Sequence, residues 1–256
     1  MPLVKSNEVD IHYMEAGSGP ATLWVHGAGG TAAIWWQQAE HFAKSRRFIA
    51  YDQRGYGQSA CDRSLVTVDA LVPDALAVMD AAKTRSAAVI CQSIGGWTGI
   101  GLALRAPERV ERLVLSSTMA GINHPPAIAS VMASNDKVDE RGPVSIVIGP
   151  DVFAENPFKA YLYQQATAFN TTFDRSKLGS FFSADNLVPL EDLEKVTCPV
   201  LVISGENDIL WPPQILEAIV EALPNARQEI VKGSGHSPYF ERPDVFNGLV
   251  EDFLNE

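Results

Sequence analysis

Short apolar segments alternate with helix-length segments along most of this chain of 256 residues, and this alternation limits the possible folds more than any other feature. Buried strands separated by helices of about ten to fifteen residues are typical of βαβ units. The sequence therefore predicts an α/β fold with a doubly wound, mostly parallel sheet. Strands are expected at residues 9–15, 21–26, 47–52, 86–92, 110–116, 199–204 and 227–231, and helices at 31–45, within 68–83, and at 94–106, 212–223 and 243–254.

The alternation stops between residues 119 and 196, where no clean strand is predicted. We interpret 119–196 as an inserted, mainly helical cap, and 1–118 together with 197–256 as the core that carries the sheet. Aromatic residues are concentrated in this insertion, either because a small insertion needs large side chains to pack or because they form an apolar lid over a pocket. Residues 151–182 hold eight of the 22 aromatic residues: Phe153, Phe158, Tyr161, Tyr163, Phe169, Phe173, Phe181 and Phe182.

Composition excludes several classes of partner. The chain has 31 acidic and 20 basic residues, for a net charge of -11, which disfavours binding to nucleic acid or to an anionic membrane surface. Three cysteines, Cys61, Cys91 and Cys198, are too few for a disulfide framework and indicate a reducing compartment. No signal-peptide stretch or membrane-spanning run is found, so we expect a cytoplasmic protein. The oligomeric state stays open.

A strand-to-helix junction at residues 89–96 has the pattern of a nucleophile elbow, with Ser93 followed two places later by Gly95. Such a serine lies at the carboxyl end of the sheet, where open α/β folds bind ligands. The alternative is that Ser93 only caps a helix. Ser59 is a rival that has no apolar strand directly before it and no glycine two places after it. Cys91 is a second rival, but a thiol buried beneath the turn is inert.

A serine nucleophile needs a base, and the base needs an acid that orients it. Only one of the five histidines, His236, lies in a small-residue loop just after a late strand. Asp208 lies in the loop after the preceding strand, and Glu206 is a weaker candidate acid in the same turn. The order Ser93, Asp208, His236 is the order of α/β-hydrolase triads. The other histidines are His12, His26, His41 and His124.

The glycine-rich loop at residues 26–30 follows the second apolar strand. Its Ala28 N–H, together with the Ile94 N–H, is the candidate oxyanion hole for a developing negative charge. The same loop also matches a dinucleotide-binding fingerprint, with Asp52 about twenty residues later in the place of a ribose-binding acid. That alternative gives no reason for the elbow or for the placement of Asp208 and His236.

Five stretches, HGAGG (26–30), YDQRGYGQS (51–59), CQSIGG (91–96), SGENDILWPP (204–213) and GSGHSPYFERP (233–243), together resemble the α/β-hydrolase superfamily. The resemblance implies that 51–59 is a structural loop and that 119–196 is the variable cap. The departure is Cys91, where the family most often has glycine. Serine at the elbow separates the chain from epoxide hydrolases and haloalkane dehalogenases, which have aspartate there, and from dienelactone hydrolases, which have cysteine.

Two further branches fit less well, since proline iminopeptidases usually read HGGPG in the oxyanion loop and ring-cleavage hydrolases usually have asparagine where this chain has Gln92. The remaining expectation is an esterase-like hydrolase that cleaves an ester, lactone or thioester of a small to medium apolar substrate. Trp35, Trp36 and Trp211 are expected to contact that substrate. No cofactor or metal is implied. The alternatives are a carbon–carbon bond hydrolase or lyase on the same triad, and a ligand-binding protein on a hydrolase scaffold.

Overall fold

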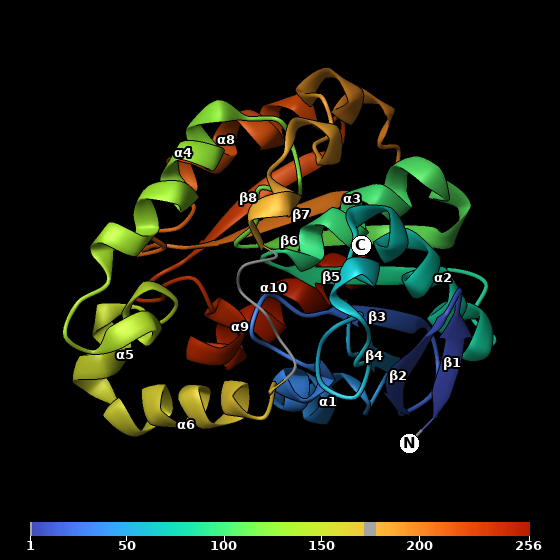
Figure 1. Ribbon diagram of the computed structural model, residues 1–256, viewed down its shortest axis with the longest axis horizontal. Helices are drawn as coiled ribbons and strands as arrows, with labels where there is room; N and C mark the ends of the chain where they lie inside the picture. The colour runs from blue at the N-terminus through green and yellow to red at the C-terminus, as the bar shows by residue number, and fades with distance from the viewer. Residues whose placement is uncertain (1, 172–177) are drawn as a thin grey trace.

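The computed structural model describes residues 2–171 and 178–256 and contains one eight-stranded sheet in the order β1-β2-β4-β3-β5-β6-β7-β8 (Figure 1). β1 and β2 pair antiparallel, as do β2 and β4, and every other neighbouring pair is parallel. The predicted mostly parallel α/β sheet is therefore confirmed. The strands are β1 Leu3–Ser6, β2 Val9–Ala16, β3 Ala21–Val25, β4 Arg47–Tyr51, β5 Ala87–Gln92, β6 Val110–Ser116, β7 Val200–Gly205 and β8 Ala226–Val231.

Helices cover both faces of this sheet and create two hydrophobic cores. The helices α2 (Leu71–Ala81), α3 (Gly95–Arg105) and α8 (Pro213–Ala222) pack on one face, and α1 (Trp36–Phe42) and α10 (Pro243–Asn255) pack on the other. Central strand β5 is buried at every position, with Val89 and Cys91 in the first core and Ile90 in the second. Strands covered on both sides read as unbroken apolar runs, which is why the sequence signal was clear.

Three local features differ from the sequence expectations. The edge strand β1 was not predicted, because it is short, mostly exposed, and joined to β2 by a tight turn in which Asn7 has a φ of 51°. The single helix expected at 31–45 is divided into a 3₁₀ turn, Ala32–Trp35, and the α1 helix. A short helix, α9 (Pro238–Glu241), also precedes α10. None of these differences moves the carboxyl ends of the central strands.

The chain between β6 and β7 forms the helices α4 (Pro125–Met132), α5 (Pro150–Glu155), α6 (Pro157–Ala168) and α7 (Leu178–Phe181), with 3₁₀ turns between them. In Figure 1, α4, α5 and α6 lie along the left of the view, beyond one end of the strands. Within the described part of this segment, the only β pairing is an isolated bridge between Ile122 and Val188. We call this segment the cap. Its boundaries at 119 and 196 stay a prediction.

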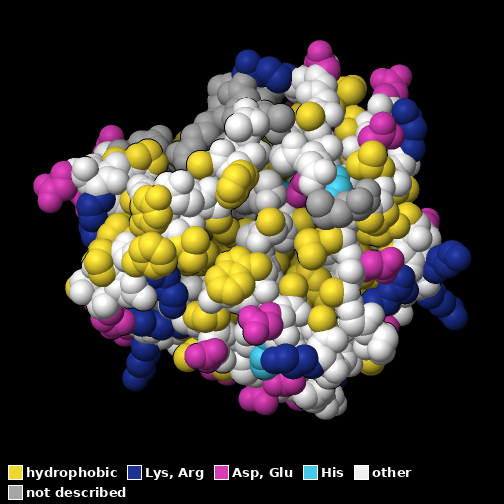
Figure 2. Space-filling view, turned by 90° about the horizontal axis from the view of Figure 1, so that it is seen from below, with side chains coloured by type: hydrophobic (Ala, Val, Ile, Leu, Met, Phe, Trp, Pro, Cys, Tyr) yellow, Lys and Arg dark blue, Asp and Glu magenta, His cyan; other side chains and the backbone are white. Residues whose placement is uncertain are grey.

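The outer face of α6 and the start of α1 expose apolar side chains (Figure 2). Three of the cap aromatics point to solvent here and not toward a pocket, while Phe173 lies outside the described residues. The exposed side chains are Trp36, Phe158, Tyr161, Leu162 and Phe169.

Among the helices of the described chain, none combines the length and the apolar character that crossing a membrane requires.

A buried ion pair holds the loop that follows β4. Arg54 donates from Nε and Nη2 to the two carboxylate oxygens of Asp74 in α2, at 2.6 and 2.5 Å. Both side chains are almost fully buried. Since removing one partner leaves an uncompensated buried charge, we expect Asp74→Ala to lower the free energy of unfolding by about 3–5 kcal/mol.

Urea denaturation would measure this loss. The matched control is Asp192→Ala, which breaks the exposed Asp192–Lys195 pair and is expected to leave the unfolding midpoint unchanged. A similar small effect for both variants would contradict the assigned role of the buried pair.

Candidate active site

Ser93 occupies a sharp turn between β5 and α3, and its φ of 52° places a non-glycine residue in the left-handed region. Such a conformation costs free energy and persists only where the surroundings hold it. Three hydrogen bonds do so here. The Ser93 N–H donates to the Ser116 carbonyl at 3.0 Å, and the Ser93 carbonyl accepts from the Gly96 N–H at 2.9 Å and from Thr118 Oγ1 at 2.5 Å.

Close packing around the turn explains the small residues beside Ser93. A Cβ at Gly95 would lie 2.6 Å from the Val25 carbonyl oxygen at the end of β3. Cys91 fits because Gly99 of α3 lies opposite it. A Cβ at Gly99 would lie only 2.7 Å from the Cys91 sulfur. Burial raises the pKa of the Cys91 thiol well above its ordinary value, so it stays protonated. Cys91 is therefore compatible with the elbow and is not the nucleophile.

His236 and Asp208 meet at the carboxyl ends of β8 and β7. His236 Nδ1 lies 2.9 Å from Asp208 Oδ2, and both side chains are buried. The other oxygen, Asp208 Oδ1, accepts from the backbone N–H of Leu210 at 2.9 Å and of Trp211 at 3.1 Å. These bonds fix the carboxylate and, through it, the orientation of the imidazole. Glu206 instead accepts from the Gly233 N–H and is exposed to solvent.

Ser93 and His236 both line a cavity of about 320 Å³. Ser93 is 7% exposed, and no described residue, His236 included, makes a hydrogen bond to its hydroxyl. The described lining residues include no Lys, Arg, Asp or Glu. The cap supplies mainly apolar side chains, Val131, Met132, Ile146, Val147, Tyr163 and Phe182. Thus aliphatic residues and methionine supply more of the lining than the aromatic residues that the sequence emphasised.

Ala28 and Ile94 line the same cavity beside Ser93. The loop holding Ala28 is a tight turn in which the Gly30 N–H donates to the Gly27 carbonyl at 3.1 Å. Across residues 2–171 and 178–256, no acceptor engages the N–H of Ala28 or of Ile94. Two unoccupied amides beside a serine hydroxyl are suited to bind an oxyanion.

The carboxylate of Asp52 is fully used inside the protein. Oδ1 accepts from the Ala32 N–H at 2.7 Å, while Oδ2 accepts from the Gln58 N–H at 2.9 Å and lies 3.1 Å from His12 Nδ1. A ribose hydroxyl would have to displace these buried bonds, so Asp52 does not support the dinucleotide alternative. Asp52 also accepts, through its carbonyl, from Ser59 Oγ at 2.7 Å, which explains why this rival serine is structural.

His26 is likewise structural, because its Nε2 accepts from the Gln53 N–H at 3.0 Å and its Nδ1 donates to the Gly27 carbonyl at 2.8 Å. Burial lowers the pKa of His26, which keeps the ring neutral. This ring anchors the glycine-rich loop that carries Ala28.

The three tryptophans take different places. Trp211 lines the cavity, its ring centre 5.6 Å from that of His236, as expected for a substrate contact. Trp35 is fully buried in the second core against Trp24 and Tyr239, and Trp36 is 48% exposed on α1. Neither lines the cavity. The prediction that Trp35 and Trp36 contact substrate does not fit these positions. Trp35 ends the 3₁₀ turn and Trp36 begins α1, and consecutive residues in helical backbone point to different sides.

Two residues at the site were missed by the sequence reasoning. Gln92 donates from Nε2 to the His236 carbonyl at 3.2 Å, and its Oε1 occupies the space that a Cβ at Gly27 would fill. Glu241 is fully buried and accepts three backbone N–H groups around His236. Burial raises the pKa of Glu241, and these hydrogen bonds oppose the shift. In the sequence, the only sign of Glu241 was a charged residue directly after the apolar stretch 238–240.

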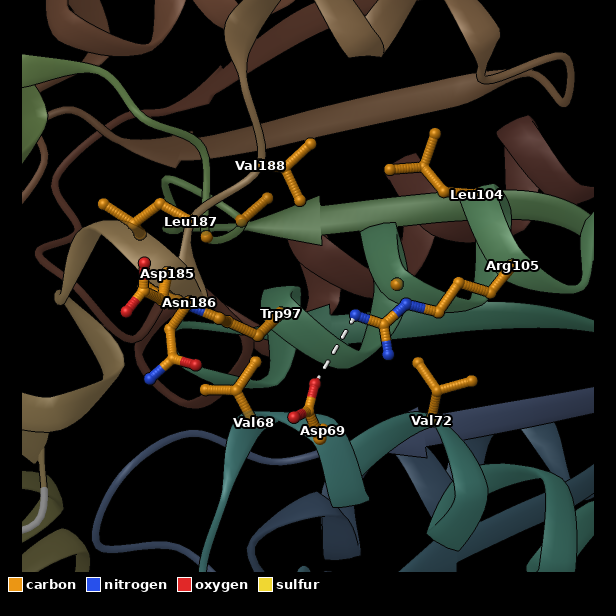
Figure 3. A pocket seen from close by; sticks show the side chains of 13 residues that line it. Val68, Asp69, Val72, Trp97, Leu104, Arg105, Asp185, Asn186, Leu187 and Val188 are labelled. Atoms are coloured by element: carbon orange, nitrogen blue, oxygen red, sulfur yellow. Dashed lines mark ion pairs between the residues drawn. The ribbon is translucent and has the colours of Figure 1, made fainter.

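Another hollow, of about 80 Å³, is lined by Trp97, Leu104 and Arg105 of α3 (Figure 3). Asp69 and Arg105 face each other across it at 4.0 Å. None of the candidate catalytic residues lines this hollow. In the part of the chain that is described, no cluster of His, Cys, Asp or Glu has the form of a metal site. The cavity beside Ser93 is therefore the candidate active site.

Comparison with known proteins agrees with this geometry. Residues 23–249 match the pattern of the Alpha/beta hydrolase family. The chain belongs to this family. It is 30% identical to the "Putative carbamate hydrolase RutD" of Caulobacter sp. (strain K31), over 98% of each chain. It is also 30% identical to the "2-hydroxymuconate semialdehyde hydrolase" of Pseudomonas sp. (strain CF600), covering 94% of this chain and 89% of that protein.

Among solved structures, the enol-lactonase from Burkholderia xenovorans LB400 superimposes with a TM-score of 0.83 at 26% identity, covering all of both chains. These similarities identify the protein as a hydrolase-family member, whereas the bonds named for the relatives differ from one another.

The close approach at Gly95 generates a prediction. Gly95→Ala places a Cβ 2.6 Å from the Val25 carbonyl oxygen, a contact that backbone must move to relieve. We expect a loss of about 1–3 kcal/mol in the free energy of unfolding. Denaturant titration would measure it, with Gly248→Ala as the control, because a Cβ at Gly248 meets nothing within 4 Å. Equal stability of the two variants would argue against a tightly packed elbow.

Proposed function

We propose that this protein is a serine hydrolase that cleaves a carboxylic ester or lactone of a small to medium, largely apolar substrate. Ser93 is the nucleophile, His236 the general base and acid, and Asp208 the acid that orients His236. The observation that carries the proposal is the 2.9 Å contact between His236 and Asp208, with His236 and Ser93 lining one cavity.

In the first half of the reaction, Ser93 Oγ attacks the carbonyl carbon while His236 takes the hydroxyl proton. The carbonyl π electrons move to oxygen, and this oxyanion is held by the N–H groups of Ala28 and Ile94. The start of α3 adds a favourable helix dipole at the same place. Collapse of the intermediate breaks the ester C–O bond, and His236 gives its proton to the leaving alkoxide oxygen.

In the second half, a water molecule attacks the acyl-enzyme. His236 removes one water proton and then returns it to Ser93 Oγ, which leaves as the alcohol, so the acid product departs and the enzyme is restored. Asp208 stays ionised throughout, stabilising the imidazolium that forms in each half.

The substrate class is supported by the lining of the cavity, which is mainly aliphatic and aromatic among the described residues. Such a surface contributes roughly 25 cal/mol per Å² of apolar substrate surface removed from water. The relatives are named as a putative carbamate hydrolase, a 2-hydroxymuconate semialdehyde hydrolase and an enol-lactonase. Carbamates and enol-lactones, together with the carbon–carbon bond that the sequence analysis left open, are therefore the alternatives to test.

A panel of p-nitrophenyl esters of increasing acyl length, together with a lactone, an aryl carbamate and a vinylogous diketone, tests the bond class. We expect turnover of the esters or the lactone, and Ser93→Ala is expected to lower kcat by about 10⁴-fold or more. Turnover of the carbamate or the diketone alone would show that the enzyme cleaves that bond and not an ester. Full activity of Ser93→Ala would refute the assignment of Ser93 as the nucleophile.

The choice of acid is tested by a pair of variants. Asp208→Asn keeps the shape but loses the charge that holds the imidazole, so kcat should fall by roughly 10³–10⁴-fold. Glu206→Gln changes a carboxylate in the same turn that contacts the Gly233 N–H instead, and its kcat should stay within twofold of the original. Steady-state kinetics on the best ester measures both variants. A larger loss of kcat in Glu206→Gln than in Asp208→Asn would make Glu206 the orienting acid.

A further inference from the structure

The loop that carries His236 is held by side chains on both sides. The N–H groups of Gly235 and Ser237, which flank His236, donate to Oε2 and Oε1 of Glu241, each at 2.9 Å. From the opposite side, Gln92 donates to the His236 carbonyl. The backbone polar groups next to the imidazole are therefore engaged by buried side chains, and Glu241 supplies two of these contacts.

The same carboxylate also reaches the cap. The Gly149 N–H, just before α5, donates to Glu241 Oε2 at 2.8 Å, so one oxygen atom joins the cap to the His236 loop. The two backbones touch as well, because a Cβ at Gly149 would lie 2.7 Å from the Gly235 nitrogen. From α6, Lys159 Nζ donates to the Glu241 carbonyl at 2.8 Å.

This arrangement makes the two segments depend on each other. Glu241 is 0% exposed, so an amide that leaves the carboxylate is not replaced by water without opening the packing around it. If Gly149 moves away with the cap, Oε2 keeps only the Gly235 N–H and the buried negative charge loses part of its compensation. Hydrogen bonds to a charged group are stronger than neutral ones, so such a movement is opposed.

We propose that Glu241 is a positioning residue that couples the seating of the cap at Gly149 to the placement of His236. The inference rests on the proposed function, since it assigns the catalytic base to His236. Glu241 does not line the cavity, and it acts only through the loop. When the cap is seated, the backbone on both sides of His236 is fixed by Glu241. When the cap segment at Gly149 lifts, the loop loses its fixed geometry and the proton transfer from Ser93 becomes slow.

The test begins with Glu241→Gln, which keeps the side-chain length but turns one acceptor into an N–H₂ donor that faces a backbone N–H. We expect kcat on the best ester to fall by roughly 10- to 100-fold, with KM changed less than threefold, because proton transfer is disturbed and the cavity wall is not. Hydrogen exchange measured by mass spectrometry should be faster in the peptides that contain Gly149, Gly235 and Ser237.

The matched control is Glu155→Gln. Glu155 ends α5 and forms an exposed 2.6 Å ion pair with Arg242, the neighbour of Glu241, so it also joins the cap to the core. Within the described residues, its hydrogen-bond partner is Arg242, and it makes no hydrogen bond to the N–H of Gly235 or Ser237. Its kcat and its exchange at Gly235 and Ser237 should stay within twofold of the original protein. An equal loss in both variants would show general weakening of cap docking and overturn the specific coupling.

A second variant covers the case in which Glu241→Gln does not fold, as judged by thermal unfolding. Gly149→Ala leaves the carboxylate intact but places a Cβ against the Gly235 nitrogen and 3.1 Å from Glu241 Oε2, which pushes the cap segment off the loop. We expect a several-fold loss of kcat and faster exchange at Gly235. Wild-type values for both would overturn the inference.

Two readouts separate this inference from the proposed function. The first is the rate at which a fluorophosphonate labels Ser93, which should fall in Glu241→Gln but not in Glu155→Gln. Unlabelled Ser93 in the original protein would refute the proposed function. The exchange rates report on the amides that contact Glu241 and do not require catalysis, so unchanged exchange in a folded Glu241→Gln would refute the coupling whatever the labelling result.

Discussion

Ser93 turns the chain from β5 into α3 with a left-handed backbone, and the surrounding packing is arranged so that this turn can exist. Gly95 lets the first turn of α3 approach the end of β3, and Gly99 leaves room for the Cys91 thiol under the elbow. Because β5 lies in the parallel part of the sheet together with β7 and β8, the strained residue lies at the edge where the loops after β7 and β8 begin. The candidate site follows from that one placement.

Residues that obey local rules could be predicted from the sequence. The elbow pattern around Ser93 needs a strand, a small-residue turn and a helix, and all three leave clear signals in one short stretch. Asp208 and His236 could be predicted because parallel strands bring their carboxyl ends to the same edge of a sheet. Their contact of 2.9 Å agrees with that topological argument. Their catalytic roles remain the proposal made above.

What could not be predicted depends on which way a side chain turns in the folded chain. Trp35 and Trp36 are adjacent in sequence, yet one is buried in the second core and the other faces solvent. Glu241 reads as an ordinary surface acid, and its role depends on an amide in the cap that is 92 residues away. The cap residues that line the cavity could not be predicted either, because aromatic content does not reveal which faces of α4 and α6 turn toward the cavity. Tyr163 lines the cavity, whereas Tyr161 on the same helix points outward.

The central claim is that Ser93 forms a covalent acyl intermediate with the help of His236. The most direct measurement is mass spectrometry of peptides from the protein quenched with acid during turnover of a p-nitrophenyl ester. We predict an added acyl mass on the peptide that contains Ser93, and no such mass in His236→Ala under the same conditions. Ester turnover with the acyl group on another residue, or undiminished acylation of Ser93 without His236, would contradict the account.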